Sequence, residues 1–170
     1  INLLKNKYEG EIEILSGFEA DYIRDLTKPS DFLKYNIDIL IGSLHFIKNK
    51  QGELMNLESG PEKFKEDLKM YFNNDLKKLI TEYYETLAEM IKSGGFIIAG
   101  HVDKIKMNIF RTEPDILKTE WYINIENKIS ELLSVFPGFI EINTRGIYKS
   151  IIEETYPSVN IIKQIFKSLH

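Results

Sequence analysis

The chain has 170 residues, of which 43% are hydrophobic and 28% are charged, and this suits one domain with an ordinary core. Its formal net charge is -4, from 22 basic and 26 acidic residues, so a broad basic surface for nonspecific nucleic-acid binding is not expected. The absence of cysteine excludes disulfides and thiolate metal sites, so any metal must be bound by His, Asp or Glu.

Strand and helix signals alternate along the first part of the chain. The apolar residues of 12–18 predict a short strand that leads to Glu19, and the proline of 29–35 starts a short helix. Residues 37–41 form a nearly continuous apolar run, which is typical of a strand covered on both faces. The polar stretch 49–60 predicts a loop.

The longest helical pattern lies in the middle of the chain. Apolar residues recur at spacings of three or four over residues 64–90, which predicts an amphipathic helix. Asn73 and Asn74 are expected to divide it into two helices. Gly94 and Gly95 are a helix stop signal, because glycine adopts the left-handed conformation that ends many helices.

The alternation continues to the end of the chain. Residues 96–99 predict a third strand, Pro114 opens a further helix, and residues 139–143 predict a fourth strand. Ser158 is expected to cap a last helix that runs through Leu169. Strands that alternate with helices predict an α/β fold with a parallel sheet and helical crossovers, either open or closed into a barrel.

Polar residues stand at the ends of the four predicted strands. These residues are Glu19, His45, His101 and Asn143, in a chain with only three histidines. The carboxyl ends of parallel strands form one rim, and one carboxylate with two imidazoles is a suitable shell for a catalytic metal with an open position. Taken singly, each has an ordinary alternative: a partly buried histidine, a solvated acid or a turn-forming asparagine.

Further charged residues lie near the same rim by chain position. Asp103 follows His101 by two residues, and it could orient an imidazole or equally cap the next turn. A cation at the rim would suit a phosphate group, although lysines are more often surface solubilisers. The nearby cations are Lys104, Lys106, Arg145 and Lys149.

Five segments resemble the PHP (polymerase and histidinol phosphatase) family. Segment 11–23 resembles the histidinol-phosphatase segment around a metal-bridging glutamate, and 38–47 resembles the segment with the next histidine ligand. Segment 100–106 is similar to the family's Gly-His-x-Asp segment. Segments 141–146 and 156–158 are similar to its late strand and following helix start. The segments come in the family's order and together span nearly the whole chain.

The resemblance implies that the chain is part of a distorted (β/α)7 barrel with two or three divalent metals, which would be zinc, manganese or iron. It implies hydrolysis of L-histidinol phosphate to L-histidinol and phosphate, in histidine biosynthesis. Glu19 would bridge two metals, while His45 and His101 would complete the protein shell of one of them, with Asp103 behind the shell. The substrate phosphate is assigned to cations near the rim: Arg145, Lys149 and Lys106.

The sequence also departs from the family pattern. The opening His-x-His and closing Asp-x-His motifs are absent, as is the histidine that helps to hold a third metal, and His170 is a poor substitute for any of them. We therefore expect residues 1–170 to form a single PHP domain that is incomplete at both ends. One complete metal shell is expected, with incomplete shells for the other metals.

Two alternatives remain open from the sequence. One is a PHP phosphoesterase or nuclease with another substrate, although the acidic balance argues against nucleic acid. The other is a non-catalytic fragment, because a barrel that lacks strands has open sheet edges. The longest charge-free apolar stretch, residues 39–47, is too short to cross a bilayer, so a cytoplasmic protein that acts on a small phosphorylated substrate is expected.

Overall fold

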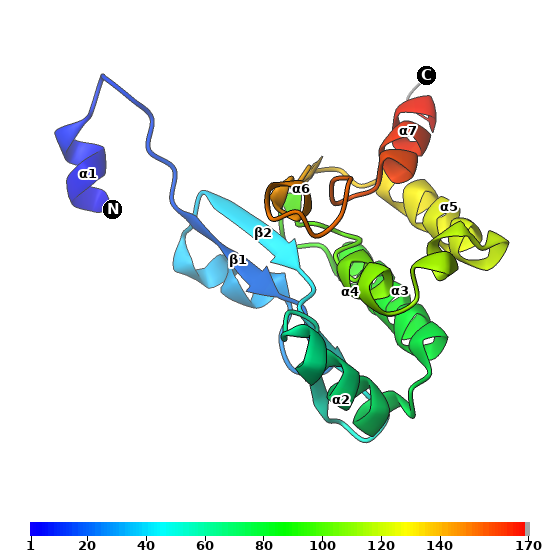
Figure 1. Cartoon of the computed structure of the whole chain (residues 1–170). Coiled ribbons are helices and arrows are strands. Elements are labelled where there is room, and N and C mark those ends of the chain that lie inside the picture. Colours follow the sequence, from blue (N-terminus) through cyan, green and yellow to red (C-terminus); the bar gives the residue numbers. More distant parts are fainter. Residues whose placement is uncertain (169–170) are drawn as a thin grey trace.

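The computed structural model describes residues 1–168 and contains a parallel sheet in the order β1-β2-β5-β6, together with a separate antiparallel pair β3-β4 (Figure 1). The strands of the parallel sheet are β1 (Gly17–Asp21), β2 (Ile39–Ser43), β5 (Ile98–Ala99) and β6 (Phe139–Ile140). All three of its pairings are parallel. The predicted α/β fold with a parallel sheet is confirmed, and within the described residues the sheet is open rather than closed into a barrel.

Helical segments connect the strands and cover the sheet. In chain order they are α1 (Asn2–Lys7), η1 (Pro29–Tyr35), α2 (Pro61–Phe72), α3 (Leu76–Ser93), α4 (Lys106–Thr112), η2 (Pro114–Lys118), α5 (Glu120–Ser134), α6 (Arg145–Tyr148) and α7 (Val159–Ser168). Figure 1 shows α1 apart from the other elements, and none of its residues is buried. Among the described residues, no helix has the length and apolar character that a bilayer crossing requires.

The core forms where the helices pack on one another and on the sheet. Leu79, Ile80, Leu87 and Met90 lie on one face of α3 and are completely buried. The predicted break after α2 is confirmed, because Asn73 and its neighbour adopt positive φ angles of 53° and 61°. A helix that buries this apolar face gains most of its stability from packing rather than from helix propensity.

The first strand begins later than predicted. Ile12 and Leu15 are exposed and lie before β1, and Glu19 lies within this strand rather than after it. A strand requires a hydrogen-bonded neighbour, and β2 supplies one only from Ile39, which lies opposite Gly17. Before Gly17, only Ser16 is bonded to this neighbour, since its carbonyl accepts the Asp38 and Ile39 amides, and the residues before it form no strand.

The polar stretch 49–60 is not entirely a loop. It contains β4 (Leu54–Asn56), which pairs antiparallel with β3 (Phe46–Lys48). Asn49 closes the connection, because its Oδ1 accepts hydrogen bonds from the Gln51 and Glu53 amides. The single core residue of β4, Met55, is completely buried, and one apolar residue among polar neighbours produces no recognisable strand pattern.

The helix boundaries of the second half also differ from prediction. Pro114 opens the 3-10 turn η2, and α5 begins only after Thr119, whose hydroxyl accepts the Tyr122 amide at 3.2 Å. Helix α4 was not predicted, because the buried polar residues Lys106 and Asn108 interrupt its apolar periodicity.

The late strand is shorter than predicted, whereas the last helix begins at the predicted residue. Strand β6 ends at Ile140, whereas Asn143 forms an isolated bridge with Tyr156 instead of extending the strand. The predicted cap of the last helix is confirmed, since Ser158 Oγ accepts the Ile161 amide at 3.2 Å. Leu169 and His170 lie outside the described residues.

A buried hydroxyl pair between α3 and α5 generates a stability prediction. Tyr84 Oη and Tyr122 Oη lie 2.9 Å apart in the core. Tyr122→Phe leaves the Tyr84 hydroxyl without its partner and should lower the free energy of unfolding by about 1–3 kcal/mol, whereas the double Phe variant should lose less than the single one. Urea unfolding tests this, with exposed Tyr35→Phe as the control, and strictly additive losses would contradict it.

Candidate functional site

The structure brings the three predicted metal ligands together. The Nε2 atoms of His45 and His101 lie 3.3 Å apart, and Glu19 Oε1 lies 3.4 Å from the first and 3.1 Å from the second. Each side chain offers one ligand atom to the same small volume. Asn143, the fourth predicted residue at the rim, does not join this group. Its side chain bonds Glu141 and the Arg145 amide instead.

The three ligands come from three neighbouring strands. Glu19 lies in β1 opposite Ile41 of β2, His45 follows β2, and His101 follows β5. His101 can come this close because Gly100 has no side chain. A Cβ on that residue would lie only 2.4 Å from Ser43 Oγ. The close approach of β2 and the end of β5 therefore decides where His101 projects.

The ligand atoms fit a small divalent cation. Donors bound at about 2.0–2.2 Å around such an ion lie about 3–3.6 Å apart, which the observed separations match. Two imidazoles and a carboxylate are ligands of zinc, manganese and iron. Without an ion, two ring nitrogens 3.3 Å apart can share at most one proton between them. The two ring nitrogens and the carboxylate oxygen therefore suit a metal ion better than they suit hydrogen bonds with one another.

Protonation favours binding as well. Burial, and then the neighbouring His45, lowers the pKa of His101, so its ring is neutral at neutral pH and can donate a lone pair. For Glu19, burial acts to raise the pKa, but the Ser43 hydroxyl, the two imidazoles and Lys104 lower it overall. A neutral imidazole beside an ionised carboxylate is the state in which both groups bind a metal.

Asp21 supports His45 and was missed by the sequence reasoning. His45 Nδ1 donates a hydrogen bond to Asp21 Oδ1 at 2.7 Å, which fixes the tautomer and turns the Nε2 lone pair toward Glu19 and His101. A signal for Asp21 existed, because residues two apart on a strand share a face, and Asp21 follows Glu19 by two.

Glu141 supports His101 and was also missed. Its Oε2 accepts the backbone amide of His101 at 2.9 Å, and its Oε1 accepts from Asn143 Nδ2 at 3.0 Å. His101 has a positive φ of 21°, an unusual conformation for a residue with a side chain, and the carboxylate helps to hold it. A contact between a side chain and a distant backbone amide cannot be predicted from a local sequence pattern.

Asp103 has a different position from the one predicted. It is completely buried, and its Oδ2 accepts the Ser158 amide at 2.7 Å. Among the described residues it makes no hydrogen bond to an imidazole, and His101 Nδ1 has no partner. The carboxylate therefore joins the turn after His101 to the start of α7.

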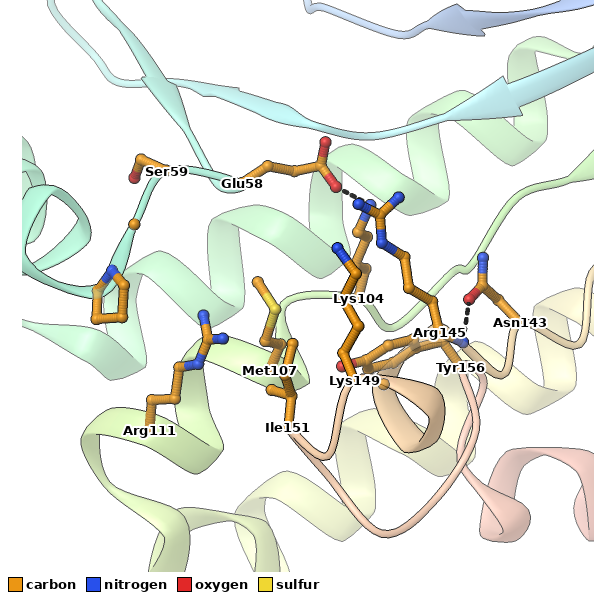
Figure 2. Close-up of a pocket in the computed structure, with 13 residues that line it drawn as sticks. Glu58, Ser59, Lys104, Met107, Arg111, Asn143, Arg145, Lys149, Ile151 and Tyr156 are labelled. Atoms are coloured by element: carbon orange, nitrogen blue, oxygen red, sulfur yellow. Dashed lines mark hydrogen bonds and ion pairs between the residues drawn. The ribbon is translucent and has the colours of Figure 1, made fainter.

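A second region of interest is a pocket of ≈ 290 Å³ that cationic side chains line (Figure 2). These side chains are Lys104, Arg111, Arg145 and Lys149. None of the three candidate ligands lines the pocket, but Lys104, three residues after His101, does, and it also feels the charge of Glu19. Its pKa is lowered overall, mainly by burial, while Glu19 acts to raise it and Arg145 to lower it. Lys104 also forms an ion pair with Glu58 at the pocket edge.

Two of the three cations predicted for phosphate line the pocket. Figure 2 shows the side chains of Arg145 and Lys149 beside Lys104. Lys106 does not line the pocket, since it is 3% exposed and its ammonium pairs with Glu154. Arg111 takes part in the pocket instead, and it was missed because the helix that carries it was not predicted.

Comparisons with known proteins found a curated relative, a similar solved structure and a matching family model. The chain is 27% identical to the "Probable histidinol-phosphatase" of Schizosaccharomyces pombe over 94% of its own length and 51% of that protein, so it spans about half of this curated relative. A crystal structure of a candidate histidinol phosphatase, HisK, from Listeria monocytogenes has the same fold, with a TM-score of 0.82 and 24% identity over 99% of this chain and 64% of that one. The model of the PHP domain matches residues 2–145, and the chain therefore belongs to the PHP domain family.

Proposed function

We propose that this chain carries part of the active site of a metal-dependent phosphomonoesterase whose substrate is L-histidinol phosphate. The observation that carries the proposal is the convergence of Glu19, His45 and His101, together with Lys104, which feels the charge of Glu19 and also lines a cationic pocket. A metal beside fixed cations is the arrangement that phosphoryl transfer requires, because its catalysis depends on positioning and on stabilisation of charge.

In this proposal the three side chains hold one divalent ion of zinc, manganese or iron. Glu19 uses Oε1 for its contacts with both imidazoles, and its carboxylate would help to hold a second ion as well. Residues 1–170 are assigned to one PHP domain, and among the described residues these three side chains form the one group that could hold an ion. The proposal thus assigns one shell to this chain and no more.

The metal ligands and the pocket cations would have different roles toward the substrate. When bound, the metal supplies Lewis-acid chemistry, which lowers the pKa of water and withdraws charge from a phosphoryl oxygen. Arg145 and Lys149 line the pocket and would bind the phosphate by charge-assisted hydrogen bonds. Lys104 lies between pocket and ligands, where it would offset negative charge that develops on the phosphoryl group.

The choice of substrate is supported by the names of the relatives. The Schizosaccharomyces pombe and Listeria monocytogenes proteins both carry the histidinol-phosphatase name. A pocket of ≈ 290 Å³ is about the lower size of a small-molecule site, and a net charge of -4 does not favour nucleic acid as the ligand. A small phosphorylated substrate, as in histidine biosynthesis, is therefore preferred to nucleic acid.

Substitution of the ligands tests the proposed activity. Glu19→Gln and His101→Ala should each reduce phosphate release from L-histidinol phosphate by at least about 100-fold, because the metal loses a ligand. Exposed Glu13→Gln, which carries the same change of side chain away from the site, should keep the activity. Wild-type rates in the two ligand variants, or cleavage of single-stranded DNA that exceeds monoester hydrolysis, would reject the proposal.

Asp21 offers a test of metal binding that does not depend on turnover. Asp21→Asn keeps the shape of the side chain but removes the charge that orients His45, and affinity for Mn²⁺ or Zn²⁺ should fall by about 10- to 100-fold. Titration calorimetry measures the affinity. Asp25→Asn makes the same change at an exposed neighbour and should bind as the wild type does. Equal affinities for all three proteins would show that Asp21 does not support a ligand.

A further inference from the structure

The side chain of Tyr156 is the unexplained polar group of the pocket. It is 3% exposed, lines the pocket, and has no hydrogen-bond partner for its hydroxyl among the described residues. Figure 2 shows the ring between the backbone near Asn143 and the side of the pocket where Met107 and Ile151 lie. The Tyr156 hydroxyl is therefore a hydrogen-bond donor that no described residue uses.

Packing alone does not account for this hydroxyl. A buried donor without a partner reduces stability, and phenylalanine would fill the same volume without that penalty. The fit around the ring is nonetheless tight. A Cβ on Gly146 would come within 2.9 Å of the Tyr156 hydroxyl, so only glycine lets α6 lie this close. The hydroxyl is thus held firmly in a position where the protein itself gives it no partner.

The same pocket contains unpaired positive charge. Arg111, Arg145 and Lys149 line it, and none of their side chains makes a hydrogen bond or ion pair with another described residue. Lys104, by contrast, is paired with Glu58. Cations that converge on a cavity without carboxylate partners attract an anion, and an arginine presents a fork suited to oxyanions.

We propose that the Tyr156 hydroxyl and Arg111 form, with Arg145 and Lys149, a binding site for the oxyanion oxygens of a phosphorylated small molecule. This inference deepens the proposed function and rests on it for the identity of the ligand, whereas the site itself needs no metal. Tyr156 donates to a phosphoryl oxygen, and Arg111 approaches the same group from α4.

The chemistry of Tyr156 suits a donor rather than an acid catalyst. Burial, and then the Asp103 carboxylate, raises the pKa of Tyr156 to about 12, although Arg111 acts to lower it. The phenol is therefore protonated throughout the neutral range. The hydroxyl is screened from water, so a ligand reaches it by displacing flexible side chains, and Figure 2 shows Lys149 and Met107 beside it.

Binding of inorganic phosphate to the metal-free protein tests the inference. Titration calorimetry should show phosphate binding by the wild type, and Tyr156→Phe should weaken it by about 10- to 100-fold, the usual effect of losing a hydrogen bond to a charged group. Arg111→Met should weaken binding at least as much. Tyr148→Phe, on the exposed face of α6 and outside the pocket lining, should bind phosphate as the wild type does.

Thermal stability separates binding from a structural role. The Tyr156 hydroxyl has no partner among the described residues, so its removal costs no hydrogen bond. The Tyr156→Phe variant should therefore melt at the same temperature as the wild type or higher. Weakened phosphate binding with undiminished stability supports the site. Unchanged phosphate affinity in Tyr156→Phe, a lowered melting temperature that accounts for the loss, or no binding by the wild type overturns it. Loss of hydrolysis in the Glu19 variant with phosphate binding intact concerns the metal mechanism and leaves this site standing.

Discussion

The parallel pairing of β1, β2 and β5 is the constraint on which the rest of the site depends. It places Glu19 opposite Ile41, and it brings the ends of β2 and β5 close enough for two imidazole nitrogens to lie 3.3 Å apart. A shift of one residue in β1 would turn Glu19 to the other face of the sheet, since side chains alternate along a strand. Backbone hydrogen bonds, rather than contacts between the side chains, thus create the group, since His45 disfavours the charged form of the neighbouring His101.

Each of the two histidines is also held from behind by a carboxylate that does not belong to the group. Asp21 fixes the ring of His45 through Nδ1, whereas Glu141 fixes His101 through its backbone amide. The difference has a physical cause. His101 has the unusual φ of 21°, so its backbone needs support, while His45 needs only the correct tautomer. Asp21 and Glu141 therefore both position a histidine, one through a ring nitrogen and the other through a backbone amide.

The sequence was sufficient for the fold class and for the prediction that Glu19, His45 and His101 lie together, because strand ends and scarce histidines can be read from it. Glu19 was expected after its strand and lies within it, but the parallel pairing still brings it to the histidines. Arg111 could not be found, because buried Lys106 hides the period of α4. Glu141 and the unpaired hydroxyl of Tyr156 depend on distant contacts and on a missing partner, and no local pattern records either.

The turn after β5 shows how a few residues join these regions. His101 faces the other ligands, Asp103 enters the core to accept the Ser158 amide, and Lys104 reaches the pocket. Three environments within four residues require an abrupt change of direction, which the positive φ of His101 provides. Asp103 ties this turn to the start of α7, just after Tyr156, so a single buried carboxylate joins the segment that positions His101 to the wall of the pocket.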